Sequence, residues 1–297
     1  MRVVRTAALA AGTATAVLFG LVVAQGRRIR EEIPRLPAAD GPRRGRSPGA
    51  GPALRVAVLG DSTGAGVGLA DIRDSLAPQL AEALAVRTGR DVHWRLAARP
   101  GATARQAHAD LLPELDDAGW RPDLVVLSLG VNDVTALRPP AAWRRDTTAL
   151  VSAVRHRFGA VPTLAAGLPP FSRFPTLPNP LRTMLAAYAA LLDRIYAAVL
   201  QAANGRHVAV SPRLIDGAGF FASDGFHPSA VGVRKWAELL ADAAVDRWAW
   251  ATAPARQGGT TPARRSDATE AQKLKVQPNA GQPITESTAN PTNNAIR

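Results

Sequence analysis

Short apolar runs alternate with segments of helical periodicity through the middle of the chain. The apolar runs predict strands at residues 54–60, 124–129, 162–166 and 207–210, and an alternating stretch predicts a further strand at residues 92–97. Between and after them, apolar residues recur every three or four positions and predict helices at residues 75–86, 103–115, 140–158, 181–203 and 229–248. Strands that alternate with helices form a parallel sheet covered by helices on both faces. The pattern therefore predicts an α/β fold.

A further apolar segment stands near the beginning of the chain. Thr6–Gly26 contains no charged residue, and about 20 residues of helix suffice to cross a bilayer. Arg27, Arg28 and Arg30 follow at once. Because positive charge beyond a cleavage site opposes export, we favour a single-pass membrane anchor over a secretory signal peptide. The more basic second flank favours a folded body on the cytoplasmic side; the secreted alternative and the opposite orientation stay open.

The regions on either side of the alternating elements differ in composition. Residues 31–53 are rich in Pro, Gly and Arg and are expected to form a linker. Residues 251–297 are rich in Thr, Asn, Gln, Pro and Ala without periodicity and are expected to form a disordered tail. The 297 residues thus divide into an N-terminal hydrophobic segment (1–30), the linker, one folded domain (54–250) and the tail.

The formal net charge of +12 resides mostly in these flanks. Residues 1–50 carry nine Arg against three acidic residues, and residues 251–297 carry six basic against three acidic residues. The 200 residues between them hold 21 basic and 18 acidic side chains, so the predicted domain lacks the concentrated basic charge of a nucleic-acid-binding surface. Because the chain has no cysteine, disulfides, thiolate nucleophiles and cysteine-ligated metals are excluded.

Polar segments that contain glycine stand at the ends of the predicted strands. Gly60-Asp61-Ser62 follows the first strand, Pro100–Thr103 the second and Gly130–Asp133 the third, while Asp224–His227 precedes the last helix. Because the carboxyl ends of parallel strands meet at one edge of a sheet, these four segments are expected to converge there.

Three side chains in these segments form a pattern typical of serine hydrolases. A serine hydroxyl becomes a good nucleophile when a histidine takes its proton and a carboxylate orients that histidine. Ser62 follows a buried strand, and Asp224 and His227 are three residues apart, which suits a carboxylate and an imidazole on one loop. The spacing therefore predicts a nucleophile early in the domain that meets its base late in the domain.

In these segments the chain resembles the SGNH hydrolases, the GDSL-like esterase and lipase superfamily. The resemblance covers roughly residues 54–248 and implies a three-layer α/β/α sandwich of flavodoxin-like type with a five-stranded parallel sheet. It implies Ser62 as nucleophile, His227 as base and Asp224 as its orienting acid, with an oxyanion hole formed by Ser62, Gly101 and Asn132. The sequence departs from the family's pattern at Thr63, where many members have Leu, and at residues 98–100.

The implied activity is hydrolysis of a carboxylic ester through an acyl-serine, without cofactor or metal. The expected partners are a small-molecule or lipid ester and, through the N-terminal segment, a membrane. An acyltransferase and a catalytically silent, membrane-tethered binding protein stay open, as do the acyl length and the oligomeric state. Residues 135–139 and 167–175 are expected to form the pocket walls, with Phe171, Phe174 and Leu177 against an acyl chain and Arg173 or Arg99 near an anionic head.

Other readings of the same segments are weaker. Gly64, Gly66 and Gly68 imitate a phosphate-binding loop, but neither a following Lys-Ser/Thr nor a distal acidic residue completes a nucleotide site. No HExxH motif or other tight His/carboxylate cluster indicates a metal. Asp61 and Asp133 are expected to be structural. The remaining histidines lack a partner at useful spacing and are expected to be structural or on the surface: His93, His108, His156 and His207.

Overall fold

The computed structural model describes residues 20–29, 31–116 and 119–248. The chain divides into two units, residues 1–256 and 257–297, and all described residues belong to the first. The expected membrane anchor, Thr6–Gly26, falls mostly outside the described residues, and the expected disordered tail falls entirely outside them. Both expectations therefore stay predictions.

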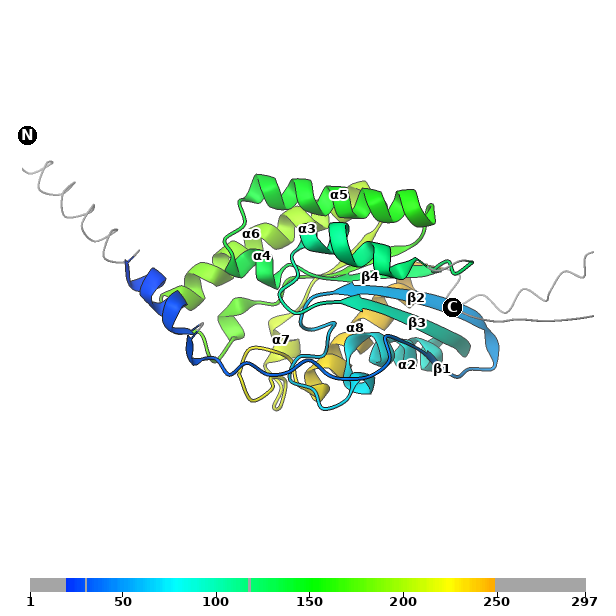
Figure 1. The fold of residues 1–297 in the computed structure, drawn as a ribbon, viewed down its shortest axis with the longest axis horizontal. Coiled ribbons are helices and arrows are strands. Elements are labelled where there is room, and N and C mark those ends of the chain that lie inside the picture. The colour runs from blue at the N-terminus through cyan, green and yellow to red at the C-terminus, as the bar shows by residue number, and fades with distance from the viewer. Residues whose placement is uncertain (1–19, 30, 117–118, 249–297) are drawn as a thin grey trace, which may run out of the picture. The chain divides into compact units, whose positions relative to one another are not determined.

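A six-stranded mixed sheet forms the centre of the domain (Figure 1). Its strands, in sequence order, are β1 (Arg44–Ser47), β2 (Gly51–Gly60), β3 (Arg90–Ala98), β4 (Leu124–Ser128), β5 (Thr163–Ala166) and β6 (Arg206–Val208). Their order across the sheet is β1-β3-β2-β4-β5-β6, and every pair is parallel except β1–β3. All five predicted strands are present. β4, β5 and the second half of β2 are buried on both faces, which explains their apolar runs, whereas β3 alternates between buried and half-buried positions.

The sixth strand, β1, corrects two expectations, the five-stranded sheet and the free linker at residues 31–53. β1 pairs antiparallel with β3 at the edge of the sheet. Gly45 lies over the ring of Trp94, where a Cβ would come within 2.5 Å of the indole. The Pro, Gly and Arg content of this segment indicates a linker. The strand forms through its pairing with β3, a tertiary contact that composition does not reveal.

The segment before β1 is also held by backbone hydrogen bonds to the loop after β2. The Ala39 amide donates to the Gly66 carbonyl at 3.0 Å, and the Gly68 amide donates to the Pro37 carbonyl at 2.9 Å. The side chain of Ala39 is buried. Residues 37–40 are therefore part of the folded domain rather than a free spacer.

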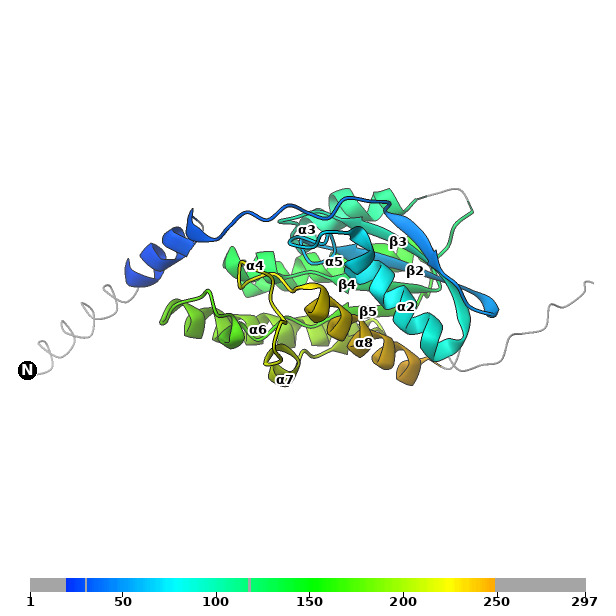
Figure 2. The ribbon, with the colours of Figure 1, turned by 90° about the horizontal axis from the view of Figure 1, so that it is seen from below.

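Helices cover both faces of the sheet, as predicted (Figures 1 and 2). α2 (Leu76–Thr88) and α8 (Ala230–Arg247) pack side by side on one face, and α5 (Pro140–Phe158) and α6 (Leu181–Ala202) pack together on the other. Gly89 ends α2 in the left-handed conformation, the role for which glycine is favoured at a helix end. The shorter helical segments are η1 (Ile72–Asp74), α4 (Val131–Thr135), η4 (Phe171–Arg173) and α7 (Pro212–Ile215).

The predicted helix at residues 103–115 is irregular. It begins as α3 (Ala104–Gln106), with a reciprocal capping box between Thr103 and Gln106, and passes through a π-helical turn, η2 (Ala107–Leu111). It ends as a 3-10 turn, η3 (Leu112–Leu115), at Pro113, whose missing amide hydrogen disfavours a regular helix.

One helix in the described part of the chain, α6, is long and apolar enough to span a bilayer. Leu185, Leu192 and Tyr196 on this helix are buried in the core on the face of the sheet that α5 and α6 cover. Its apolar character is explained by this packing, so α6 gives no support to membrane anchoring.

Gly130 joins β4 to α4 at a crowded turn. Its φ is +118°, and a Cβ there would lie 2.6 Å from Leu168 Cδ2 and 2.9 Å from the Trp143 ring. Gly130→Ala should therefore lower the free energy of unfolding by about 2–4 kcal/mol, through backbone strain and overpacking together. Urea unfolding measures this loss.

The matched control is Gly89→Ala, because Gly89 also has a positive φ (+67°) but has open space around its Cβ position. That variant should lose only about 1 kcal/mol. Equal losses in the two variants would show that the Gly130 turn is not sterically crowded.

Candidate active site

The sheet register brings three strand ends to the same level. Gly60 at the end of β2 is paired with Ala98, the last residue of β3, and with Ser128, the last residue of β4. The chain leaves β2 towards α2 on one face and leaves β3 towards α3 on the other. Such a point, where connections diverge, opens a crevice at the carboxyl edge of a parallel sheet.

A cavity of about 680 Å³ occupies this crevice. Ser62, Gly101, Asn132 and His227 all line it. These are four of the five residues predicted for the site, and they come from positions up to 165 residues apart in the chain. The fifth, Asp224, is buried behind His227.

Asp224 holds His227 through both of its carboxylate oxygens. Oδ2 contacts the Nδ1 of His227 at 2.6 Å, and Oδ1 accepts hydrogen bonds from the backbone amides of Phe226 and His227, each at 2.9 Å. The Asp224 side chain is fully buried, whereas that of His227 is 18% exposed. With Nδ1 engaged by the carboxylate, Nε2 is the ring nitrogen available to a proton donor in the cavity.

Ser62 lies on a tight turn that follows β2. The Asp61 amide donates to the Ser128 carbonyl at 3.1 Å, and the Val67 amide donates to the Ser62 carbonyl at 3.0 Å. A Cβ on Gly64 would lie 3.0 Å from the Cα of Gly60, and a Cβ on Gly60 would lie equally close to the Cα of Gly64, so a side chain at either position would crowd the turn. Ser62 itself is 8% exposed.

The glycines that imitate a phosphate-binding loop serve this turn and the segment that crosses it. Gly66 and Gly68 have positive φ angles, and Cβ atoms there would press on Ala39 and Leu36. Their conformations and contacts explain both glycines without a phosphate.

Gly101 faces the cavity from the loop after β3, and Asn132 faces it from α4, which follows β4. Gly101 has a φ of +81° with open space at its Cβ position, so glycine is favoured there for conformation rather than for room. The Asn132 side-chain amide donates one hydrogen bond to the Ala102 carbonyl at 3.0 Å. This bond fixes the amide and leaves its second hydrogen for a ligand in the cavity.

Two buried carboxyl groups lie beneath these loops. Asp61 Oδ1 accepts from the Thr63 amide and Asp133 Oδ2 accepts from the Ala104 amide, both at 3.1 Å. Burial raises the pKa of Asp61 to about 7 and that of Asp133 to about 6. Each side chain thus ties down one loop of the site, in agreement with the structural role expected for both.

The pocket walls agree only in part with those expected: Thr135 lines the cavity, but no other residue of 135–139 or 167–175 does. Leu177 lines the cavity, but Phe171 and Phe174 stack on each other inside the core, with ring centroids 4.8 Å apart. Arg173 and Arg99 form ion pairs with Asp216 and Asp110, respectively, and neither lines the cavity. The aromatic pair is drawn inward because η4 packs on α6.

One wall of the cavity, formed by the segment before the domain, was not expected from the sequence. Gly26, Ile29, Ile33 and Leu36 all line the cavity. The available signal was a set of apolar residues at three- and four-residue spacing within a segment otherwise rich in charge.

Two of the remaining histidines have acidic partners that were not expected. His93 Nε2 contacts Asp91 at 2.9 Å, and His207 Nε2 contacts Asp193 at 2.7 Å. Neither histidine lines the cavity that contains Ser62. The described residues include no group of three or more acidic or histidine side chains that could hold a metal ion.

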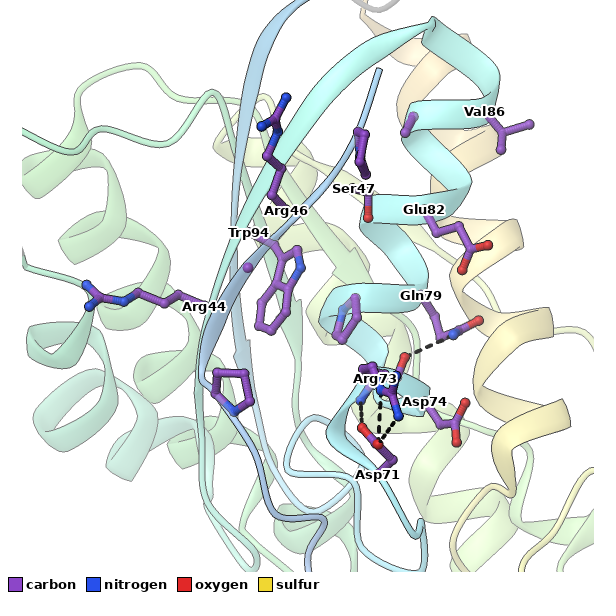
Figure 3. Close-up of a pocket in the computed structure, with 15 residues that line it drawn as sticks. Arg44, Arg46, Ser47, Asp71, Arg73, Asp74, Gln79, Glu82, Val86 and Trp94 are labelled. Atoms are coloured by element: carbon purple, nitrogen blue, oxygen red, sulfur yellow. Dashed lines mark hydrogen bonds and ion pairs between the residues drawn. The ribbon is translucent and has the colours of Figure 1, made fainter. Parts of the chain in front are cut away.

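A second cavity, of about 760 Å³, lies between β1 and α2, away from these residues (Figure 3). Trp94 approaches it from β3 and Glu82 approaches it from α2, whereas the Arg44 side chain extends away from α2. It is larger than the Ser62 cavity, but none of the predicted site residues lines it. We therefore place the candidate active site in the Ser62 cavity.

The α/β fold with its central sheet is that of the SGNH hydrolases, and comparison with known proteins agrees. The profile of the GDSL-like lipase/acylhydrolase family matches residues 58–235. The chain belongs to this family, which makes it a hydrolase of ester substrates.

The chain is similar to a known esterase and to solved structures. It is 29% identical over 261 residues to the GDSL-like esterase Rv1075c of Mycobacterium tuberculosis. The alignment covers 79% of this chain and 80% of that protein. The crystal structure of TesA superposes with a TM-score of 0.54 at 25% identity, covering 66% of this chain and 100% of that one. The lipase Lip_vut3 from a goat rumen metagenome shares the fold, with a TM-score of 0.53 at 15% identity over 64% of this chain and 97% of that one.

Asp133→Asn tests the buried charge beneath the site. Because the pKa of Asp133 is about 6 when folded against 3.8 ordinarily, the folded protein binds more protons than the unfolded chain between these values. Ionisation of Asp133 thus costs stability as the pH rises. Relative to wild type, the variant should gain about 1–3 kcal/mol between pH 4 and pH 7 in urea unfolding at a series of pH values.

The matched control is Asp246→Asn, an exposed carboxyl group on α8. Its stability relative to wild type should be nearly independent of pH. A flat profile for Asp133→Asn as well would contradict a buried, costly charge at this position.

Proposed function

We propose that the chain is a serine esterase that cleaves carboxylic esters through an acyl-serine intermediate. The observation that carries the proposal is the single cavity lined by Ser62 and His227, with Asp224 bonded to His227 Nδ1 at 2.6 Å. Membership of the GDSL-like family supports ester substrates. The assignment of roles to individual residues is part of the proposal.

In the first half of the reaction, His227 Nε2 takes the proton of the Ser62 hydroxyl while Oγ attacks the ester carbonyl. Asp224 keeps Nδ1 protonated and stabilises the imidazolium that forms. The same imidazolium then gives its proton to the departing alcohol, which leaves the acyl group on Ser62. In the second half, His227 takes a proton from a water molecule that attacks the acyl carbon, and returns it to Ser62 Oγ as the acyl–oxygen bond breaks and the acid is released.

The negative charge that develops on the carbonyl oxygen needs donors that are already in place. We assign this role to the backbone amides of Ser62 and Gly101 and to the free amide hydrogen of Asn132. The bond from Asn132 to the Ala102 carbonyl supports the assignment, because it orients the amide before substrate binds. Asp61 and Asp133 contribute indirectly by fixing the turns that carry Ser62 and Gly101.

The apolar lining favours an ester with an apolar acyl group. Leu177, Leu181 and Leu185 face the cavity together with Phe226.

We retain, as part of the proposal, an N-terminal anchor at Thr6–Gly26 that places the enzyme at a membrane surface, with secretion as the alternative.

Ser62→Ala removes the proposed nucleophile and should reduce kcat/KM for p-nitrophenyl esters by about 10⁴-fold or more, with unchanged circular dichroism and thermal stability. A panel of p-nitrophenyl esters of increasing chain length provides the assay. Ser172→Ala, on the exposed surface of η4, is the matched control and should keep full activity. Full activity in Ser62→Ala would end the proposal.

Asn132→Ala removes one proposed oxyanion donor. We expect kcat to fall by about 10²–10³-fold while KM changes only a few-fold, because the lost hydrogen bond forms mainly in the transition state. Steady-state kinetics separate the two parameters. A rise in KM with an unchanged kcat would instead assign Asn132 to ground-state binding.

A further inference from the structure

The cavity at Ser62 is completed by residues that precede the family-matched part of the chain. Residues 20–29 are helical, and the segment from Gly26 to Leu36 supplies the cavity-lining residues Gly26, Ile29, Ile33, Pro34, Arg35 and Leu36. The family profile matches only residues 58–235. This wall therefore lies outside the residues that the family profile matches.

Gln25 bonds this segment to the domain at two points. Its Nε2 donates to the Asn179 carbonyl at 2.8 Å, and its Oε1 accepts from the Leu181 amide at 3.1 Å. Leu181 begins α6, and the first amides of a helix have no partner within the helix. Gln25 thus serves as a helix cap supplied from a distant part of the chain.

Apolar packing reinforces this attachment. Val22 and Ile29 pack against the core cluster that contains α5 and α6. Beyond the helix, Gly68 donates to the Pro37 carbonyl and would clash with Leu36 if it carried a Cβ. The segment is therefore fixed at both of its ends, on α6 and on the loop that follows Ser62.

A second wall of the cavity, which adjoins this segment at Leu181, is also apolar. Leu177, Leu181 and Leu185 come from α6 and the loop before it. Together with Ile29 and Ile33 they enclose a space that continues to Ser62 and His227. An alkyl chain attached to an ester carbonyl at Ser62 fits this chemistry, because both walls remove methylene groups from water.

We infer that residues 25–29 and 31–36 form one wall of an acyl-binding site, that Ile29 and Ile33 determine the acyl length accepted, and that Gln25 is the positioning residue of this wall. The inference rests on the proposed esterase function and adds a specificity determinant from outside the matched domain. Gly26, which ends the expected membrane span Thr6–Gly26, is also the first residue that lines the cavity.

Long and short acyl groups depend on this wall differently. An acetyl group carries its reacting carbon beside Ser62 and has no chain to reach the wall. Each further methylene removed from water contributes roughly fourfold in affinity. Changes in the wall should therefore alter the turnover of long-chain esters and leave that of acetate esters intact.

The test compares kcat/KM for p-nitrophenyl decanoate and p-nitrophenyl acetate, below the micelle concentration, in the full-length protein. Ile33→Asn should lower the decanoate-to-acetate ratio by about tenfold or more, since it places an amide against the alkyl chain. Gln25→Ala should lower the same ratio by about threefold to tenfold, because the wall loses both hydrogen bonds to α6. Acetate turnover within twofold of wild type shows that each variant is folded.

Val86→Asn is the matched control, a β-branched apolar residue changed to Asn on the exposed surface of α2. It should leave the ratio unchanged. Ile33→Phe provides a second reading if Ile33→Asn fails to fold, because a larger apolar side chain shortens the cavity and should move the preference towards shorter esters.

The outcomes separate the inference from the function on which it rests. An unchanged ratio in both the Ile33 and Gln25 variants, with hydrolysis still dependent on Ser62, overturns the inference and leaves the esterase proposal intact. Wild-type protein that hydrolyses acetate but not decanoate also overturns it. Hydrolysis that survives in Ser62→Ala removes the proposed function and the inference together.

Discussion

The register of β2 with its two neighbours is the constraint on which the site depends. Because Gly60 pairs with both Ala98 and Ser128, the three strands end at one level, and Ser62, Gly101 and Asn132 follow within two to four residues. A shift of one residue in either pairing would turn the side chains of that strand to the opposite face. The buried apolar side chains of β2 and β4 fix the register and so determine where Ser62 and Asn132 lie.

Buried carboxylates hold the loops of the site in place. Asp61 binds the Thr63 amide, Asp133 binds the Ala104 amide, and Asp224 binds two amides as well as His227. The burial that raises the pKa of Asp61 and Asp133 shows that this arrangement costs stability. A stable domain tolerates such a cost where rigid loops are needed for preorganised donors.

Sequence patterns predicted what depends on local chemistry and missed what depends on distant contacts. The five buried parallel strands and the four converging segments follow from apolar runs and from glycine-containing polar segments. β1 was missed because its pairing with β3 decides its structure, and Phe171 was placed in the pocket although η4 folds it into the core. The wall at Ile29 and Ile33 was missed because its position depends on the hydrogen bonds from Gln25 to the start of α6, about 155 residues further along the chain.

The central claim is that Ser62 is a nucleophile activated by His227. Labelling with a fluorophosphonate, followed by mass spectrometry of the digested protein, tests it most directly, because only an activated hydroxyl reacts rapidly with this reagent. The account predicts a stoichiometric adduct on Ser62 in wild type and a rate of labelling lowered by orders of magnitude in His227→Ala. An adduct on another residue, or labelling of Ser62 at the same rate without His227, would contradict it.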